Sequence, residues 1–255
     1  MGRVAFIGAG PGAADLITLR GARLLAQADV VLHDALTDPA LRELAPRARW
    51  IDVGKRGFCD STAQTRINAL LVKHASGLSL VVRLKGGDPS VFGRLEEELE
   101  ALREAAIDCE VVPGVTAAIA AAAATQRPLT RRGSGRSVSL STAMTQAGEL
   151  RASRTADTEV FYMAGRQLAA LSRRLLEAGW LPDTPVCVVS RTGWPDELVS
   201  DHHVCTLAQA GLLHSGRRNL VTVGAGASAI REPAKHAEGN HLAQMQIKSV
   251  ETPKL

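Results

Sequence analysis

The chain has 255 residues, of which 45% are hydrophobic and 22% charged, values that exclude a disordered or low-complexity chain and predict a folded protein of one or two domains. Its net charge is +4 and only 3% of its residues are aromatic, so we expect no nucleic-acid partner. No apolar run reaches the roughly 20 residues of a membrane span, and the amino terminus lacks a signal-peptide pattern, so we expect a cytoplasmic protein without a membrane partner.

Short β-branched runs alternate with amphipathic segments along the first half of the chain. The runs predict strands at 4–7, 30–32, 51–53, 80–84 and 110–112. A capping box at 61–64 predicts the start of one helix, and 96–105 predicts another. This alternation indicates an α/β fold with a largely parallel sheet.

The second half repeats this alternation after an interruption. An alanine-rich helix from Thr116 leads into the basic, glycine-containing segment 131–136, which we interpret as a connection between domains. A helix at 167–178 and strands at 138–140, 160–162, 186–189 and 220–223 predict a second α/β domain. The expected division is an N-terminal domain, a connection, a C-terminal domain and a polar tail, at 1–113, 114–136, 137–226 and 227–255.

A first glycine motif follows the first predicted strand. Residues 8–13 match G-x-G-x-x-A, and Asp34 ends the second strand at the distance typical of a ribose-binding acid, which together predict a dinucleotide site. Pro11 removes one backbone donor from this loop, however, and the helical pattern begins only near Thr18. A glycine turn that passes closely over the sheet edge explains the motif equally well.

A second glycine motif, Gly86-Gly87-Asp88, follows the fourth strand. The carboxyl ends of parallel strands are where open α/β sheets bind ligands, and paired glycines allow a ligand to approach the backbone. The Asp88 carboxylate can accept hydrogen bonds from hydroxyl or ammonium groups. We therefore predict a ligand site here, with a plain strand-to-helix turn as the alternative.

Several charged residues lie near these loops. Lys55 and Arg56 follow the third strand, and Arg94 and Glu97 are three residues apart at a helix start, where they form a surface salt bridge or contact a substrate together. Dispersed arginines such as Arg131 suit a cleft that attracts a small polyanion, or else a solvated face. From its strand position alone, Met163 is expected to fill the core.

Seven stretches resemble one enzyme family in order and spacing over about residues 3–226: VAFIGAGPG at 4–12, DVGKR at 52–56, VRLKGGDP at 82–89, VFGR at 91–94, VPGVTA at 112–117, PLT at 128–130 and VFYM at 160–163. They resemble the uroporphyrinogen-III C-methyltransferases. The related precorrin methyltransferases and diphthine synthases typically lack the second glycine block followed by VFGR.

The resemblance implies two α/β domains with the active site in the cleft between them, in a homodimer. It implies S-adenosylmethionine as methyl donor, converted to S-adenosylhomocysteine, and transfer of two methyl groups to C2 and C7 of uroporphyrinogen III. The product would be precorrin-2, a precursor of sirohaem or cobalamin. We expect methylation alone, because the chain lacks the additional domain that gives some relatives dehydrogenase and chelatase activities.

The resemblance also implies roles for individual residues. Asp34 and Lys55 match the proposed proton acceptor and donor, while Arg94 and Glu97 match a substrate-facing pair. The implied cofactor contacts are Pro11, Gly86, Gly87, Asp88, Val91, Thr116, Ala117, Met163 and Thr192. Eight carboxylates on the substrate would give Arg56, Arg131 and Arg132 a binding role, since arginine pairs bidentately with carboxylates. Methyl transfer requires in-line alignment of the attacking carbon, the methyl group and the sulfur, followed by removal of a proton. We expect no metal.

The chain departs from the family pattern at Asp60, at Leu95 and Glu96, at Arg131, and at Ala143 and Met144. These positions cluster on the inferred substrate side. A methyltransferase for another tetrapyrrole, such as a precorrin, is therefore an alternative. A NAD-dependent oxidoreductase and a non-catalytic binding protein are two further alternatives, and the first leaves the second glycine block unexplained.

Overall fold

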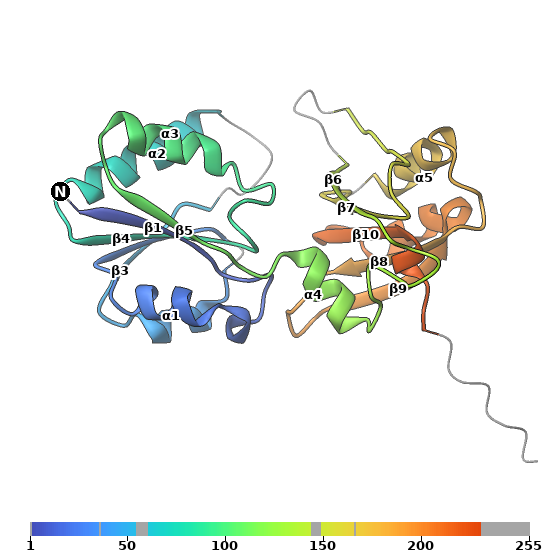
Figure 1. The fold of residues 1–255 in the computed structure, drawn as a ribbon, viewed down its shortest axis with the longest axis horizontal. Coiled ribbons are helices and arrows are strands. Elements are labelled where there is room, and N and C mark those ends of the chain that lie inside the picture. The colour runs from blue at the N-terminus through green and yellow to red at the C-terminus, as the bar shows by residue number, and fades with distance from the viewer. Residues whose placement is uncertain (1, 36, 55–60, 144–148, 166, 231–255) are drawn as a thin grey trace, which may run out of the picture.

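A computed structural model describes residues 2–35, 37–54, 61–143, 149–165 and 167–230. These residues form two five-stranded sheets that Figure 1 shows side by side, with helix α4 between them at the front. The first sheet contains only strands from the first half of the chain, and the second sheet only strands from the second half. The mixed α/β class predicted from the sequence is confirmed.

The sequence predicted a largely parallel sheet, and the first sheet is entirely parallel, with strand order β3-β2-β4-β1-β5. Its strands are β1 (Arg3–Gly8), β2 (Val30–His33), β3 (Arg49–Asp52), β4 (Leu80–Lys85) and β5 (Cys109–Val112). Its helices are α1 (Leu19–Leu25), α2 (Ser61–Ala75) and α3 (Leu95–Glu104), with the short 3-10 helices η1 (Ala14–Leu16) and η2 (Pro39–Leu44). Figure 1 shows α2 and α3 over one face and α1 over the other.

Side-chain alternation along β1 explains this layering. Ala5 and Ile7 pack on the α1 side with Leu25, whereas Val4 and Phe6 pack on the opposite side among α2 and α3 residues. Successive strand side chains point to opposite faces, so a strand that is apolar throughout must be covered on both sides. All four side chains are fully buried.

The second sheet is mixed, with order β6-β7-β10-β8-β9. Its strands are β6 (Val138–Thr142), β7 (Thr158–Tyr162), β8 (Pro185–Ser190), β9 (Leu198–His203) and β10 (Asn219–Gly224). Only β6 and β7 run parallel, and the remaining pairs are antiparallel. The edge strand β9 was not predicted, because its sequence is largely polar and its side chains alternate between half-buried and exposed.

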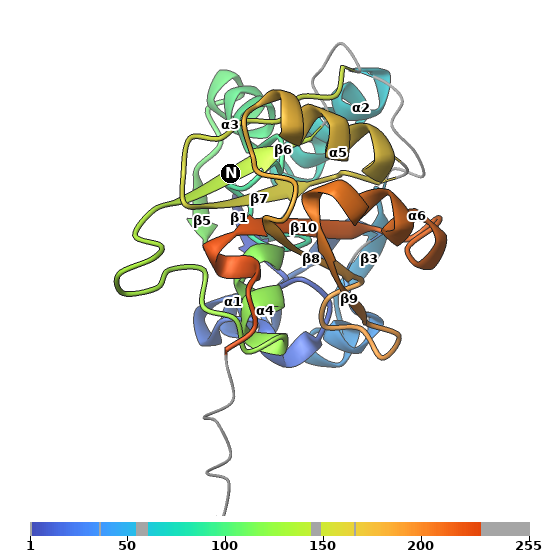
Figure 2. The same cartoon turned by 90° about the vertical axis from the view of Figure 1, so that its right-hand side faces the viewer.

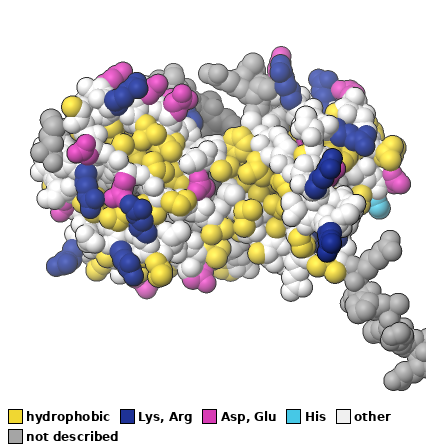
Figure 3. Space-filling view, viewed as in Figure 1, with side chains coloured by type: hydrophobic (Ala, Val, Ile, Leu, Met, Phe, Trp, Pro, Cys, Tyr) yellow, Lys and Arg dark blue, Asp and Glu magenta, His cyan; other side chains and the backbone are white. Residues whose placement is uncertain are grey.

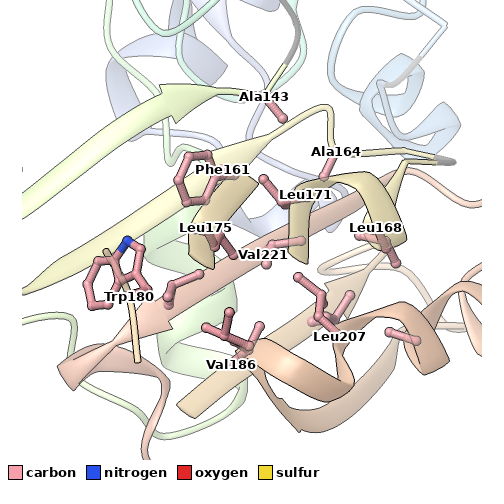
Figure 4. Packing of buried hydrophobic residues seen from close by; sticks show 14 residues of the cluster. Ala143, Phe161, Ala164, Leu168, Leu171, Leu175, Trp180, Val186, Leu207 and Val221 are labelled. Carbon is pink, nitrogen blue, oxygen red and sulfur yellow. The ribbon is translucent and has the colours of Figure 1, made fainter. Parts of the chain in front are cut away.

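Helices cover both faces of the second sheet. Figure 4 shows Leu171 and Leu175 of α5 (Leu168–Glu177) packing against Phe161 and Val221, with Leu207 of η3 (Val204–Gln209) nearby. The short helix α6 (Ala210–Leu213) follows η3, as Figure 2 shows. On the other face lies α4 (Ala117–Ala124), which falls within the segment expected to connect the two domains.

The last described turn, η4 (Ala225–Ala227), is attached to the second sheet. Gly226 N–H donates to Thr158 Oγ1 at 2.8 Å, and Arg127 Nη1 donates to the carbonyl of Ala227 at 3.0 Å. Most of the expected polar tail, from residue 231 onward, lies outside the described residues. Within the described part of the chain, no helix combines the length and apolarity that crossing a bilayer requires.

Candidate functional site

Three glycine turns meet at the carboxyl ends of β1, β4 and β5. Gly10 N–H donates to the Gly87 carbonyl at 3.3 Å, and Gly87 N–H donates to the Gly10 carbonyl at 2.7 Å. A Cβ placed on Gly8 would lie only 2.5 Å from Gly114 Cα, so no larger residue fits at position 8 without moving the backbone. The two glycine motifs found in the sequence therefore form one continuous floor with a third turn.

This pairing bears on the first glycine motif. Both backbone groups of Gly10 are bonded to Gly87, and α1 begins only at Leu19 with Thr18 as its N-cap. A dinucleotide loop would instead present free N–H groups and a helix N-terminus directly to a pyrophosphate. The geometry favours the interpretation of residues 8–13 as a turn that packs closely against neighbouring backbone.

The second glycine motif borders open space. Gly87 has φ +73°, and a Cβ added to it would meet only Thr116 Cα, at 3.9 Å. Asp88 ties the turns together, because its Oδ2 accepts from Gly114 N–H at 2.9 Å and its Oδ1 from Ser90 N–H at 2.8 Å. Each carboxylate oxygen can still accept a further hydrogen bond from a ligand. Residues 86–88 thus offer a cradle beside the sheet edge.

The second sheet contributes Tyr162 to this region. Its hydroxyl lies 2.7 Å from Thr116 Oγ1 and accepts from Ala118 N–H at 3.2 Å. Its ring packs against Phe92, with ring centroids 5.0 Å apart. Burial raises the pKa of Tyr162, so the phenol stays protonated at neutral pH. Sequence reasoning missed Tyr162, although it stands directly before Met163 in the stretch that carried the resemblance.

Met163 corrects the expectation that it fills the core. Its side chain is 40% exposed, and its φ of +56° lies in the left-handed region that L-residues adopt at a cost of about 1–2 kcal/mol. A strained, exposed methionine at the end of β7 is more typical of a functional position than of packing. This placement agrees with the cofactor role that the resemblance implies.

The other residues predicted to contact a cofactor lie on the same group of loops or next to it. A Cβ on Gly12 would lie 2.6 Å from the Thr192 carbonyl and from Trp194 Cδ1, so the turn after β8 packs on the first glycine loop. Thr192 is buried. The remaining residues of the set are half-buried: Pro11, Gly86, Val91, Thr116 and Ala117.

Asp34 lies at the carboxyl end of β2, the strand next to β4. Its N–H donates to the Leu84 carbonyl at 3.3 Å, and its Oδ1 accepts from Arg83 Nη2 at 2.6 Å. Burial lowers the pKa of Arg218, in the turn before β10, while the charge of Asp34 opposes that shift. Asp34 is thus within electrostatic reach of a cation from the second half of the chain.

Arg94 and Glu97 form the ion pair expected from their spacing. Arg94 Nε and Nη2 donate to the two Glu97 carboxylate oxygens at 2.5 and 2.6 Å, and both side chains are more than 40% exposed. The hydrogen bond with Glu97 raises the pKa of Arg94. Both residues line an open groove of about 720 Å³ together with Ser90, Phe92, Gly93, Leu95, Glu96, Leu99, Glu100 and Arg103. Since Phe92 also contacts Tyr162, the groove adjoins the Gly87 cradle.

Comparison with known proteins places the chain in a family. The model of the tetrapyrrole (corrin/porphyrin) methylases matches residues 3–210. The chain belongs to the tetrapyrrole methylases. A uroporphyrinogen-III C-methyltransferase from Pseudomonas aeruginosa is 46% identical over 192 residues, which cover 74% of this chain and 78% of the relative. A siroheme synthase from Psychrobacter sp. is 42% identical over 78% of this chain, but the match covers only 42% of that longer protein.

Solved structures agree with this assignment. A uroporphyrin-III C-methyltransferase from Thermus thermophilus, in complex with S-adenosyl homocysteine, superposes with a TM-score of 0.77 and 35% identity over 88% of this chain and 97% of that one. The fold and the family expected from the sequence are therefore both confirmed.

The structure does not bring Arg131 to the Gly87 cradle of this tetrapyrrole methylase. The Arg131 guanidinium donates to the Ser228 carbonyl and lines a pocket of about 370 Å³ with Asp157 and Gly224. Gly224 pairs with Thr158, at the opposite end of β7 from Tyr162. The expectation that Arg131 contacts a substrate near the other site residues is therefore not supported by its position, and the exposed Arg132 follows it in the same loop.

The structure also places some of the departures from the family pattern. Leu95 packs against the core beneath α2 and α3, and Glu96 lines the groove of Arg94. Ala143 is fully buried. Four residues singled out in the sequence, namely Lys55, Arg56, Asp60 and Met144, lie outside the described residues.

Proposed function

We propose that this tetrapyrrole methylase transfers methyl groups from S-adenosylmethionine to C2 and C7 of uroporphyrinogen III and so produces precorrin-2. The observation that carries the proposal is the open cradle at Gly87, bordered by Thr116 and Tyr162, in a chain 46% identical to a named uroporphyrinogen-III C-methyltransferase. Precorrin-2 would then serve as a precursor of sirohaem or cobalamin.

The residues of the cradle fit the cofactor. S-adenosylmethionine supplies an electrophilic sulfonium methyl group, and the Thermus thermophilus neighbour was solved with the corresponding product bound. Gly86 and Gly87 allow the cofactor to approach the backbone, and Asp88 provides acceptors for its hydroxyl or ammonium groups. We assign Pro11, Val91, Thr116, Ala117, Met163 and Thr192 to the remainder of this pocket.

We place the substrate on the open side of the cradle. An electron-rich pyrrole needs little activation, so the chain mainly aligns the attacking carbon with the methyl group and then removes a proton. We assign proton acceptance to Asp34 and proton donation to Lys55. Arg94 and Glu97, which border the adjoining groove, would contact the substrate together with Arg56. We leave out Arg131 and the adjacent Arg132, because their loop lies at the far end of the second sheet.

The active site would lie between two domains, at 1–113 and 137–226. Contacts across these boundaries support such a location: Thr116 of the connecting segment bonds to Tyr162, Phe92 packs on Tyr162, and Gly12 lies against Thr192. Loops from both halves would then enclose the cofactor, as expected for a ligand site at a domain interface.

A homodimer in the cytoplasm would be the working form. Val111 on the edge strand β5, Ile119 on α4 and Leu140 on the edge strand β6 are exposed hydrophobic residues, and Figure 3 shows hydrophobic side chains gathered on the face where Figure 1 places β5 and α4. Such patches support association. The described cysteines Cys109, Cys187 and Cys205 are free thiols, which suits a reducing compartment. Light scattering of the wild type and of Ile119→Glu tests the dimer.

Calorimetry followed by an activity assay tests the function. The chain should bind S-adenosylhomocysteine and should not bind NAD. It should then transfer methyl groups to uroporphyrinogen III in the presence of S-adenosylmethionine. Binding of NAD alone would favour an oxidoreductase, whereas transfer to a precorrin but not to uroporphyrinogen III would indicate a different tetrapyrrole substrate.

A further inference from the structure

A cluster of four charged side chains lies behind the proposed site. Arg83 and Lys85 of β4 are both bonded to Glu98 of α3, at 3.1 Å through Arg83 Nε and at 2.8 Å through Lys85 Nζ. These three side chains are at most 3% exposed. The fourth member is Asp34, which is bonded to Arg83 and is 29% exposed. The cluster therefore runs from the interior to the edge of the site.

Charge balance allows this cluster to be buried. Two cations face two anions, and Arg83 and Glu98 also make hydrogen bonds outside these ion pairs. Burial of ions without such pairing would be strongly unfavourable. Burial alone would lower the pKa of Arg83. The negative charges and hydrogen bonds of Asp34 and Glu98 outweigh this effect and raise the pKa above its ordinary value. Burial and the neighbouring Arg83 lower the pKa of Lys85, while Glu98 opposes that shift.

Arg83 is held rigidly. Its Nη1 donates to the carbonyls of Leu32 and Leu84 at 3.4 and 3.2 Å, in addition to the bonds that Nε and Nη2 make with Glu98 and Asp34. Four of the five guanidinium donors are thus engaged. Glu98 is itself fixed by Gln64, whose Nε2 donates to Oε1 at 3.2 Å. A planar guanidinium held in this way can orient a carboxylate on its open side.

Only one oxygen of Asp34 is used by this arrangement. Oδ1 accepts from Arg83, whereas Oδ2 makes no hydrogen bond with any residue in the described part of the chain. Among the described residues, the charged and titratable groups near Asp34 are Arg83 and Lys85 from β4, Arg218 from the turn before β10, and the neighbouring His33, whose Nδ1 lies 3.2 Å from the Asp34 carbonyl. The free oxygen is the one that can receive a proton.

We propose that Arg83 is a positioning residue, which fixes Asp34 through Oδ1 so that Oδ2 accepts the proton released after methyl transfer. This inference rests on the proposed function. When the pyrrole carbon forms its bond to the methyl group, the bond from methyl to sulfur breaks, the sulfur becomes a neutral thioether, and the macrocycle becomes a cation. The macrocycle then loses a proton to Oδ2, and the electron pair of that C–H or N–H bond stays in the macrocycle and makes it neutral.

A double-mutant cycle separates positioning from a merely structural role. The four proteins are the wild type, Asp34→Asn, Arg83→Gln and the double variant, each assayed for single-turnover methyl transfer to uroporphyrinogen III with saturating S-adenosylmethionine. We expect Asp34→Asn to lower the rate about 100-fold or more and Arg83→Gln to lower it about tenfold or more. The double variant should be no slower than Asp34→Asn, because Arg83 acts through Asp34.

Folding and cofactor binding are followed in the same proteins. Arg83→Gln leaves Glu98 paired with Lys85, so we expect it to fold and to bind S-adenosylhomocysteine within about twofold of the wild type. If it fails to fold, the cycle is run with Arg83→Lys, which keeps the buried charge. Arg127 supplies the matched control and is given the same substitution as Arg83, Arg127→Gln or Arg127→Lys. It is a largely buried arginine paired with Asp201, on β9 of the other sheet, and the rate of the control variant should be unchanged.

Each outcome is decisive. Non-additive rates with intact cofactor binding support the proposal. Rates that multiply in the double variant, or loss of cofactor affinity in Arg83→Gln, show a structural role and overturn it while the function stands. A wild type that transfers no methyl group to uroporphyrinogen III overturns the proposed function, and the role of Arg83 falls with it.

Discussion

Gly10 and Gly87 hydrogen-bond to each other in both directions, and both have positive φ angles, +79° and +73°. Each belongs to a different glycine motif, and their pairing holds the turns after β1 and β4 side by side. Gly10 is thus a support, whereas Gly87 also borders the open space in which we place the cofactor. Substitutions at the two types of glycine should differ in effect.

Gly87→Ala should weaken cofactor binding far more than it weakens the fold. A Cβ there meets nothing closer than Thr116 Cα at 3.9 Å, so the folded chain loses only about 1–2 kcal/mol to backbone strain. The same Cβ would intrude on the cofactor, and we expect the affinity for S-adenosylhomocysteine to fall at least about tenfold by calorimetry. Gly179→Ala is the control, since its φ is +92° and its Cβ would also meet nothing closer than 3.9 Å. Equal affinities in both variants would contradict the assignment.

Tyr162→Phe isolates the role of one hydroxyl. The ring contact with Phe92 is kept, while Thr116 Oγ1 and Ala118 N–H lose their partner. We expect a loss of about 1–3 kcal/mol in the free energy of unfolding, because a backbone donor at the start of α4 is left unsatisfied. Cofactor affinity should fall as well, since Thr116 is no longer held. Urea unfolding and calorimetry measure the two effects, and no change in either would show that the hydroxyl is dispensable.

Arg94→Ala should reduce turnover of uroporphyrinogen III and leave the affinity for S-adenosylhomocysteine nearly unchanged. Its exposed pair with Glu97 contributes little to stability, whereas a charge-assisted contact with a substrate carboxylate is worth about 1.5–3 kcal/mol. The wild-type KM should also rise with salt, as expected for a polyanionic substrate.

The control for this variant is Arg174→Ala. Arg174 forms an exposed ion pair with Glu177, also three residues away, on helix α5, which packs against the second sheet. Its kinetics should match those of the wild type. Loss of cofactor affinity in Arg94→Ala, with normal turnover at saturating cofactor, would place Arg94 in the cofactor pocket instead.

Acidification should destabilise the second half of the chain through His214. Its side chain is 1% exposed, and its Nδ1 and Nε2 lie 2.5 and 2.8 Å from the hydroxyls of Ser190 and Ser200. Burial lowers the pKa of His214, with smaller contributions from His202 and Arg217, so the folded state binds a proton less readily than the unfolded chain. Its contribution to stability is therefore complete above a pH of about 6.5 and decreases as the pH falls from there through the folded-state pKa.

Urea unfolding at about pH 7.5 and pH 5.5 measures this effect of His214. The free energy of unfolding should be smaller at the lower pH, and His214→Gln should show a weaker dependence. A free energy that rises on acidification would contradict this assignment.

The parts of the fold that depend on local pattern were predictable. Short β-branched runs located every strand of the first sheet to within two residues, and Gly86 and Gly87 were placed correctly at a carboxyl strand end. The pairing of Gly10 with Gly87 was not predictable, because it depends on β1 and β4 being neighbours in the sheet. The strand β9 escaped detection because an edge strand needs no continuous apolar face.

The site residues show the same division. The spacing of Arg94 and Glu97 predicted their ion pair, since residues three apart on a helix are neighbours. The bond between Asp34 and Arg83 joins separate strands and has no local signature. Position in the sequence suggested a core role for Met163, whereas the left-handed backbone at the end of β7 leaves its side chain exposed. Tertiary context decides such cases.

Counting the methyl groups transferred to uroporphyrinogen III tests the central claim most directly. The purified chain is incubated anaerobically with uroporphyrinogen III and S-adenosylmethionine carrying a labelled methyl group, and the product is analysed by mass spectrometry and NMR. The account predicts two labelled methyl groups per tetrapyrrole, at C2 and C7, with S-adenosylhomocysteine as co-product. A tetrapyrrole that remains unlabelled, while the chain binds S-adenosylhomocysteine normally, would contradict it.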